Sequence, residues 1–251
     1  MSRVALVTGV GRDVGIGAAL ARRLAADGFD VALSYWHPYD ERVHGSGAPA
    51  GPAAVADAVR ATGRRALAVE ADLALATTPA ELFTAVEEGL GPVTALVLSH
   101  CESVDSDIAS TTVESFDRHM AVNARATWLL VREFAARFRG PAGTGRIVAL
   151  TSDHTAGNLP YGASKGALDR IVLAAAVELA DLRVSANVVN PGPTDTGWMT
   201  PELHHRLAER TPLGRVGTPD DAAALVAFLC SPGGGWVNGQ LLHSDGGISA
   251  G

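Results

Sequence analysis

The sequence predicts an α/β protein in which a doubly wound, mostly parallel seven-stranded sheet carries helices on both faces. Short apolar, β-branched segments alternate with alanine- and leucine-rich segments of helical periodicity, and 47% of the residues are hydrophobic while only 5% are aromatic. This alternation is typical of parallel sheets with right-handed crossovers, whose strands are buried on both faces. No linker or change of composition divides the chain, so residues 1–251 are predicted to be one domain.

Seven apolar segments are predicted to be strands, and they begin at Arg3, Asp30, Ala66, Ala95, Arg146, Ser185 and Gln240. Segments with helical spacing lie between them, at Gly17–Asp27, Pro52–Ala61, Thr78–Gly89, Ser115–Phe138 and Ser164–Asp181. Glycine and proline predict a long exposed loop at residues 37–52. Residues 194–219 follow the sixth strand, where binding loops are common, and are expected to form the substrate loop.

The charge and the two cysteines exclude several classes of protein. The formal net charge is −7 and no basic run is present, which argues against nucleic-acid binding. The N-terminus runs directly into a strand pattern and no apolar run reaches membrane-spanning length, so we expect a cytoplasmic protein without a membrane partner. Cys101 and Cys230 are too few for a disulfide framework or a metal-ligand set, so both are expected to be reduced and no metal is expected.

The segment TGVGRDVGIG, residues 8–17, joins the first predicted strand to the first predicted helix. A glycine-rich turn in this context is typical of dinucleotide binding, although an ordinary turn between strand and helix is the alternative. Gly9 permits a tight turn, Gly15 lets the backbone approach a pyrophosphate, and Gly17 allows the helix to pack closely on the strand. The helix N-terminus adds unpaired N–H groups and the positive end of its dipole.

Tyr161 and Lys165 stand four positions apart in the segment YGASK. On a helix this spacing puts both side chains on one face, one turn apart. A free tyrosine has a pKa of about 10, and a nearby ammonium group lowers it by favouring the phenolate. We therefore predict a proton donor, Tyr161, whose pKa is lowered by Lys165; the alternative is a solvated pair on a surface helix.

Several motifs occur in an order that resembles one enzyme family. They are TG…GIG in the glycine turn, Asn123 in MAVNARAT, YGASK, NVVNPGPTDT, PLGRVGTP and the closing GQLLHSDGG. Together they span essentially the whole chain and resemble the short-chain dehydrogenase/reductases, which are single-domain Rossmann-fold oxidoreductases. Within that family the sequence is most similar to 3-oxoacyl-carrier-protein reductases. The resemblance implies a small-molecule carbonyl or alcohol substrate and a homotetramer or homodimer.

The resemblance also implies roles for four residues. Tyr161 would protonate the oxygen of a carbonyl that receives hydride, and Ser152 would be the second hydrogen-bond partner of that oxygen. Asn123 would hold a water in the proton relay. Lys165 would bind the nicotinamide ribose as well as tune Tyr161.

Ligands of a doubly wound sheet bind at the carboxyl ends of the strands, where the strand order reverses. By resemblance, Asp72 would approach the adenine and Thr194 the carboxamide of a nicotinamide cofactor. The predicted cofactor-binding residues are Thr8, Gly9, Gly11, Arg12, Gly15, Ile16, Gly17, Tyr35, Asp72, Leu73, Ser99, Lys165, Pro191, Gly192 and Thr194.

Two segments depart from the family pattern. The segment DHTAGNLP between Ser152 and Tyr161 is shorter than usual, which leaves Thr151 and Thr155 as alternatives to Ser152. The second departure is LSHC, Leu98–Cys101, where the family usually has Asn-Asn-Ala-Gly. A leucine cannot replace the side-chain hydrogen bonds of the usual asparagine, and Cys101 is interpreted as a small apolar filler.

The end of the second predicted strand indicates which nicotinamide cofactor is used. A carboxylate there would bind the ribose 2′-hydroxyl and repel a 2′-phosphate, but the chain has Ser34, Tyr35 and Trp36. The guanidinium of Arg12 in the glycine turn can bind a phosphate and favours NADP(H), whereas the carboxylate of its neighbour Asp13 counts against a phosphate there. NADP(H) is therefore favoured, with NAD(H) as the alternative.

The sequence thus predicts an NADP(H)-dependent oxidoreductase that interconverts a ketone or 3-oxo group and a secondary alcohol. Within the same class, an NADH-dependent enoyl reductase or a reductase of carrier-bound substrates stays open. A hypothesis from another class of protein is a catalytically weak, dinucleotide-sensing regulatory protein, which the short segment after Ser152 and the segment LSHC suggest. Against that reading, Tyr161, Lys165, Ser152 and Asn123 are all present.

Overall fold

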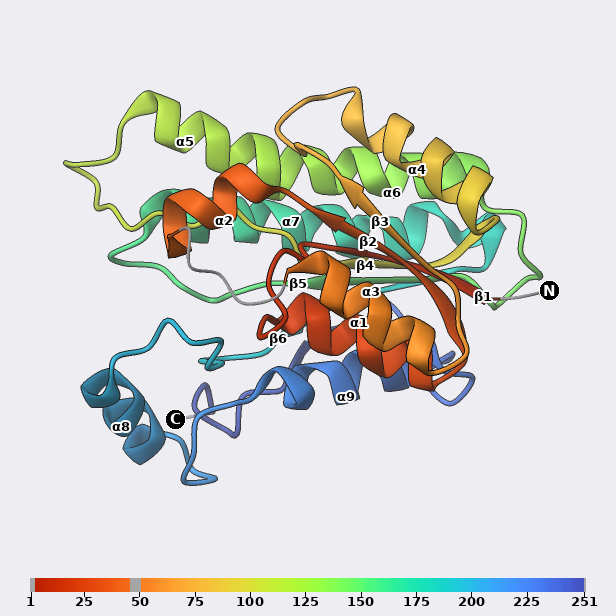
Figure 1. The fold of residues 1–251 in the computed structure, drawn as a ribbon. Coiled ribbons are helices and arrows are strands. Elements are labelled where there is room, and N and C mark those ends of the chain that lie inside the picture. Colours follow the sequence, from red (N-terminus) through yellow and green to blue (C-terminus); the bar gives the residue numbers. More distant parts are fainter. Residues whose placement is uncertain (1–2, 46–50, 251) are drawn as a thin grey trace.

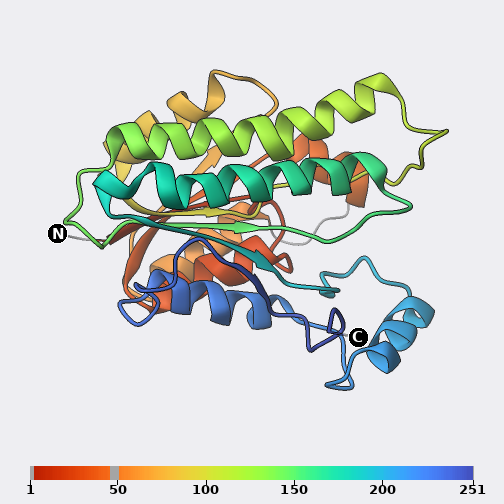
Figure 2. The same ribbon diagram turned by 180° about the vertical axis from the view of Figure 1, so that it is seen from behind.

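The computed structural model of the protein describes residues 3–45 and 51–250. Seven strands form a sheet in the order β3-β2-β1-β4-β5-β6-β7, and all neighbouring pairs are parallel (Figures 1 and 2). The strands are β1 (Arg3–Thr8), β2 (Phe29–Tyr35), β3 (Ala66–Glu70), β4 (Val93–Leu98), β5 (Arg146–Leu150), β6 (Ser185–Asn190) and β7 (Leu241–His243). The predicted doubly wound sheet is confirmed, and its strand order reverses between β1 and β4.

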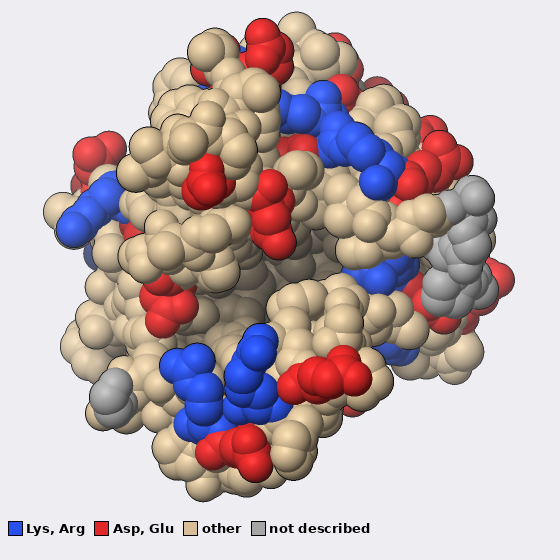
Figure 3. Space-filling view, turned by 90° about the vertical axis from the view of Figure 1, so that its left-hand side faces the viewer, with Lys and Arg blue, Asp and Glu red and all other residues tan. Residues whose placement is uncertain are grey.

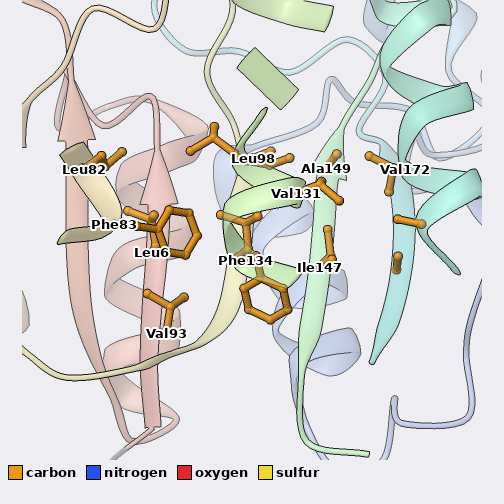
Figure 4. Close-up of a cluster of buried hydrophobic side chains, with 14 of the residues drawn as sticks. Leu6, Leu82, Phe83, Val93, Leu98, Val131, Phe134, Ile147, Ala149 and Val172 are labelled. Carbon is orange, nitrogen blue, oxygen red and sulfur yellow. The ribbon is translucent and has the colours of Figure 1, made fainter. Parts of the chain in front are cut away.

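Helices cover both faces of the sheet. On one face lie α1 (Ile16–Ala26), α3 (Pro52–Ala61) and α9 (Pro219–Cys230), and on the other lie α4 (Thr78–Gly89), α6 (Ala126–Arg137) and α7 (Leu159–Glu178) (Figures 1 and 2). Side chains of each strand alternate between the two layers, because successive residues of a strand point to opposite faces. In β1, Leu6 joins the core beside Phe83 and Phe134 (Figure 4), whereas Val7 packs in the layer under α1.

The predicted helix Ser115–Phe138 is helical up to Arg137, begins two residues earlier than predicted, at Val113, and has three parts. These are α5 (Val113–His119), a π-helical segment η1 (Met120–Arg125) and α6. A π-helical segment inside an α-helix is uncommon and is frequently found at functional sites. Here it carries Asn123.

The predicted start of α7 at Ser164 was five residues too late. The helix begins at Leu159 with Pro160 in its first turn, a position where proline is favourable because its missing N–H has no intrahelical partner. Tyr161 therefore lies in the first turn of α7, at its N-terminal end. A short 3₁₀ turn, η2 (Ala180–Leu182), follows the helix.

The predicted loop at residues 37–52 was wrong for its first half. Residues His37–His44 form α2, with Pro38 in the first turn, and Gly45 ends the helix at a φ of 78°. Residues 46–50 of that loop lie outside the described residues.

The predicted loop at residues 194–219 contains a helix as well. This helix, α8 (Pro201–Arg210), is capped by the Thr200 hydroxyl, which accepts a hydrogen bond from the Leu203 N–H. The alanine-rich α9 after it was not among the predicted helices. It begins with a reciprocal capping box between Thr218 and Asp221.

None of the helices in the described part of the chain combines the length and the apolar character that crossing a bilayer requires. Among residues 3–45 and 51–250, no group of three His, Cys, Asp or Glu side chains is arranged to hold a metal ion. Cys101 and Cys230 are both free thiols, and burial raises the pKa of Cys230 to about 12.

Candidate active site

A cleft of about 1090 Å³ opens at the carboxyl ends of the strands, and Figure 3 shows it as a hollow with both acidic and basic side chains around it. Segments that are far apart in the sequence line it: the glycine turn, the ends of β2 and β3, residues 99–105, residues 151–161 and residues 190–198. The predicted residues that line the cleft are Gly9, Gly11, Arg12, Gly15, Ile16, Gly17, Tyr35, Asp72, Leu73, Ser99, Ser152, Tyr161, Pro191, Gly192 and Thr194. Thr8, Asn123 and Lys165 are buried directly behind this lining.

The glycine turn has the backbone geometry expected of it. Gly9 has a φ of 75°, and a Cβ there would come within 2.7 Å of the His100 backbone. A Cβ on Gly17 would lie 2.5 Å from the Gly9 carbonyl oxygen, so glycine is what lets α1 pack this closely. Gly15, which precedes α1, lines the cleft, and no side chain in the described part of the chain caps the helix there.

His100, the third residue of LSHC, links the segment after β4 to two other elements. Its Nδ1 lies 2.7 Å from Thr8 Oγ1, and its Nε2 lies 3.1 Å from the Val122 carbonyl oxygen. Because a carbonyl only accepts, Nε2 carries the proton and Nδ1 accepts from Thr8. His100 therefore ties β1 to η1 through the segment after β4.

Tyr161 and Ser152 both line the cleft, and of the two alternatives to Ser152 only Thr151 lines it as well. Burial raises the pKa of Tyr161, the neighbouring Cys101 thiol adds to this, and a hydrogen bond with Ser152 opposes it. Thr151 is buried, and Thr155 is exposed and is not one of the residues that line the cleft.

Lys165 is 2% exposed, and its Nζ donates a hydrogen bond of 2.8 Å to the Leu150 carbonyl oxygen. Nζ lies 5.7 Å from the centre of the Tyr161 ring. Burial lowers the pKa of Lys165, whereas the nearby Cys101 and Asp169 act to raise it. Lys165 lies near Tyr161 as predicted, but the predicted lowering of the Tyr161 pKa was wrong. The pKa of Tyr161 is raised, because burial is the largest influence on it.

The side chain of Asn123 is fully engaged by its neighbours. Its Oδ1 accepts from the Glu102 N–H at 2.7 Å, and its Nδ2 donates to the Glu102 carbonyl at 2.9 Å and to Ser164 Oγ at 2.8 Å. Ser164 Oγ in turn donates to the Tyr161 carbonyl at 2.8 Å. Asn123 thus connects η1, the segment after β4 and the first turns of α7.

The short segment between Ser152 and Tyr161 is accommodated by a glycine. A Cβ on Gly162 would lie 2.0 Å from the His154 carbonyl oxygen, so this segment rests directly on the backbone of α7. Ser152 Oγ accepts from the His154 N–H at 3.2 Å. At the other end, buried Asn158 donates to Ser103 Oγ at 3.0 Å and to Asp105 Oδ1 at 2.8 Å.

Arg12 joins the glycine turn to the segment that precedes α8. Its Nη1 donates to the Thr196 carbonyl at 3.1 Å, and its Nη2 lies 3.4 Å from Thr196 Oγ1. At the far end of the cleft, Asp72 Oδ1 accepts from the Ala74 N–H at 2.9 Å and fixes the turn after β3. The hydroxyl of buried Thr194 donates to the Gly192 carbonyl at 3.2 Å.

Comparison with known proteins identifies the family. Residues 9–249 match a family model described as enoyl-(acyl carrier protein) reductase. The chain is 35% identical over 254 residues to the Bacillus subtilis (strain 168) protein named uncharacterized oxidoreductase YjdA, which covers 99% of this chain and 98% of that protein. It is 35% identical over 260 residues to the 3-oxoacyl-[acyl-carrier-protein] reductase MabA of Mycobacterium tuberculosis (strain ATCC 25618 / H37Rv), with coverage of 100% and 94%. The chain belongs to the short-chain dehydrogenase/reductase family.

The solved structures agree with this assignment. A blue fluorescent protein from a metagenomic library, crystallised in complex with NADPH, has a TM-score of 0.86 to this chain at 34% identity, covering 98% of both chains. As a short-chain dehydrogenase/reductase, the protein is an oxidoreductase.

A dinucleotide fits this short-chain dehydrogenase/reductase at the glycine turn. The nearest atom that a Cβ on Gly15 would meet outside its chain neighbours is the Arg12 carbonyl oxygen at 3.4 Å, and the N-terminus of α1, which no described side chain caps, suits an anion. One group opposes the fit, namely the Asp40 carboxylate, which lies against Gly11. The sequence argument about the end of β2 missed Asp40, because residues 37–52 were predicted to be a loop.

Sequence reasoning missed other residues of the site as well. His100 was given no role, since its bond to Thr8 joins positions far apart in the chain. Glu102 is buried and pairs with Arg42 and Arg118 across the cleft wall. Asn158 could have been found, because an asparagine two residues before a proline is a helix-start signal.

Proposed function

We propose that the protein is an NADP(H)-dependent reductase that interconverts a ketone or 3-oxo group and a secondary alcohol, with Tyr161 as its proton donor. The observation that carries the proposal is that Tyr161 and Ser152 both line the cleft, with buried Lys165 beside the tyrosine ring. An oxygen that approaches both hydroxyls can accept two hydrogen bonds as negative charge develops on it.

The nicotinamide cofactor would supply a hydride to the carbonyl carbon. Tyr161 then donates its proton to the carbonyl oxygen, and Ser152 donates a hydrogen bond to the same oxygen. Tyr161 is protonated near neutral pH and so has a proton to give in the direction of reduction, although burial raises its pKa and makes it a weaker acid than a free tyrosine. Lys165 places a positive charge close to the phenolate that remains after transfer, so it stabilises that state.

Asn123 has the relay role in this proposal through its main chain. Its side chain holds the backbone of Glu102, so it keeps the segment after β4 in place. Its carbonyl accepts a hydrogen bond from Thr127 Oγ1 at 2.8 Å, and the relay water would be a further partner of this oxygen.

Three observations support NADP(H) as the cofactor. The structural relative named above was crystallised with NADPH. Arg12 lines the cleft at the glycine turn, and the end of β2 has Ser34 and Tyr35 in place of a carboxylate. Asp72, Leu73 and Thr194 line the remainder of the cofactor path.

A reductase of carrier-bound 3-oxoacyl or enoyl substrates is the second candidate. The name of MabA and the description of the matching family model favour it. We also propose that the protein is cytoplasmic and forms a homodimer or homotetramer. Trp128 on α6 and Trp236 before β7 are exposed and offer apolar contact area, which size-exclusion chromatography with light scattering tests.

Fluorescence titration with NADPH and NADH, followed by cofactor oxidation across a panel of simple ketones, 3-oxoacyl thioesters and enoyl thioesters, tests the function. We expect tighter binding of NADPH and turnover of a ketone or 3-oxoacyl substrate. Turnover of enoyl thioesters alone would replace the carbonyl proposal with the second candidate. Binding of either cofactor without turnover of any substrate would favour the regulatory alternative.

A further inference from the structure

Helix α2 lies over the part of the cleft where the strand order reverses. It follows β2 directly, and its residues Tyr39, Asp40 and Arg42 line the cleft. On one side it contacts the glycine turn after β1, and on the other it contacts the segment after β4. The helix therefore bridges the two strand ends between which a dinucleotide is expected to pass.

The Asp40 carboxylate lies directly on the glycine turn. A Cβ built on Gly11 would be 1.8 Å from Asp40 Oδ2 and 2.7 Å from Asp40 Cγ, so the carboxylate occupies the space that glycine leaves. Burial raises the pKa of Asp40, while the charges of Arg12 and His37 oppose this shift. A half-buried carboxylate thus lies on the glycine turn, in the part of the cleft best suited to a phosphate.

Two further contacts hold α2 against the segment after β4. Tyr39 Oη lies 3.8 Å from Cys101 Sγ, and Arg42 forms an ion pair with Glu102. The Glu102 side chain is 3% exposed and also pairs with Arg118 Nε at 3.1 Å. Because Arg118 remains, Arg42 can leave without stranding an unpaired buried charge, which would be strongly destabilising.

We propose that α2 is a gate over the cofactor cleft, and that the Asp40 carboxylate holds it shut by occupying the place of a cofactor phosphate beside Gly11 and Arg12. This inference rests on the proposed function, since it assumes a dinucleotide phosphate at the glycine turn. A carboxylate and a phosphate repel each other at this distance, so binding of the dinucleotide displaces Asp40 and lifts α2 from Cys101 and Glu102. Arg12, whose guanidinium donates to Thr196 at the glycine turn, then meets the phosphate.

The test compares NADPH binding by the full chain and three variants. Asp40→Asn keeps the shape of the side chain but removes its charge, and Arg42→Gln releases the contact with Glu102. Glu41→Gln is the matched control, because it makes the same charge change on the exposed face of α2. The measurements are the Kd for NADPH by fluorescence and the hydrogen exchange of the amides of residues 39–44 with and without NADPH.

The gate predicts that Asp40→Asn and Arg42→Gln tighten NADPH binding about tenfold, while Glu41→Gln changes it less than about twofold. It also predicts that NADPH makes the α2 amides of the unaltered protein exchange faster. Equal effects of Asp40→Asn and Glu41→Gln, or α2 amides that become protected by NADPH, would overturn the gate.

These outcomes separate the gate from the proposed function. If the unaltered protein binds NADPH and reduces carbonyls while the variants bind it equally well, the gate alone fails. If neither the unaltered protein nor any variant binds NADPH or NADH, both the gate and the proposed function fail. Binding by Asp40→Asn alone would support both.

Discussion

The buried imidazole of His100 makes the stability of the protein depend on pH in a way that can be calculated. The residue is 5% exposed, with Nδ1 accepting from Thr8 and Nε2 donating to the Val122 carbonyl. Protonation would put a second donor on Nδ1 and leave a buried charge without solvation. Burial, followed by the positive charge of Lys165, lowers the pKa of His100 to about 3, from 6.5 in an unfolded chain.

The sign and size of the effect follow from proton linkage. Between pH 6.5 and pH 3 the unfolded chain binds one proton at His100 that the folded protein does not, so acid favours unfolding. The contribution of His100 to stability is complete above pH 6.5 and falls by about 1.4 kcal/mol for each pH unit below it. At pH 5 the free energy of unfolding is therefore lower by about 2 kcal/mol than it is above pH 6.5.

Urea denaturation at a series of pH values between 7.5 and 4.5 measures this slope. The variant His100→Gln keeps an amide that can donate to Val122 but has no proton to gain. At neutral pH the variant is expected to be less stable than the unaltered protein. Its free energy of unfolding should also depend less on pH, because the contribution of His100 is gone. The difference in the free energy of unfolding between the unaltered protein and the variant should thus shrink by about 2 kcal/mol from pH 7.5 to pH 5. An identical pH slope in both proteins would refute the argument.

Two further substitutions test the geometry around Tyr161. Ser152→Ala should lower kcat about 100- to 1000-fold while the Kd for NADPH changes little, because the hydroxyl supports the developing charge only during reaction; steady-state kinetics with an unchanged kcat would remove Ser152 from the site. Gly162→Ala should destabilise the protein by about 1–3 kcal/mol in urea denaturation, because the new methyl group would meet the His154 carbonyl. Gly166→Ala in the same helix is the control, since a Cβ there meets no described atom within 4 Å and should leave stability equal or higher. Equal effects of the two glycine substitutions would show that the close approach at Gly162 is absent.

The elements that could be predicted from the sequence are those with local causes. Buried parallel strands show as apolar runs, and the glycine turn is recognisable because it stands between a strand and a helix. The helix Thr78–Gly89 was predicted with its observed bounds, since its apolar spacing is regular. Tyr161 and Lys165 were found through the segment YGASK, and Ser152 through its place after the fifth predicted strand; Lys165 Nζ lies 5.7 Å from the centre of the Tyr161 ring, and Tyr161 and Ser152 both line the cleft.

What could not be predicted depends on contacts between distant segments. The raised pKa of Tyr161 comes from burial in the cleft, which a spacing of four residues does not reveal. Asp40 reaches the glycine turn only because residues His37–His44 form a helix, and a proline near its start resembled a loop signal. The role of His100 depends on Thr8 and Val122, which lie on two other elements.

The central claim is that Tyr161 donates the proton that completes carbonyl reduction, and Tyr161→Phe tests it most directly. The substitution removes one hydroxyl and keeps the ring that packs near Lys165. The account predicts that the variant binds NADPH with a Kd within about twofold of the unaltered protein while its turnover of every reducible substrate in the panel is lost. Turnover that persists at the original rate in Tyr161→Phe would contradict the account.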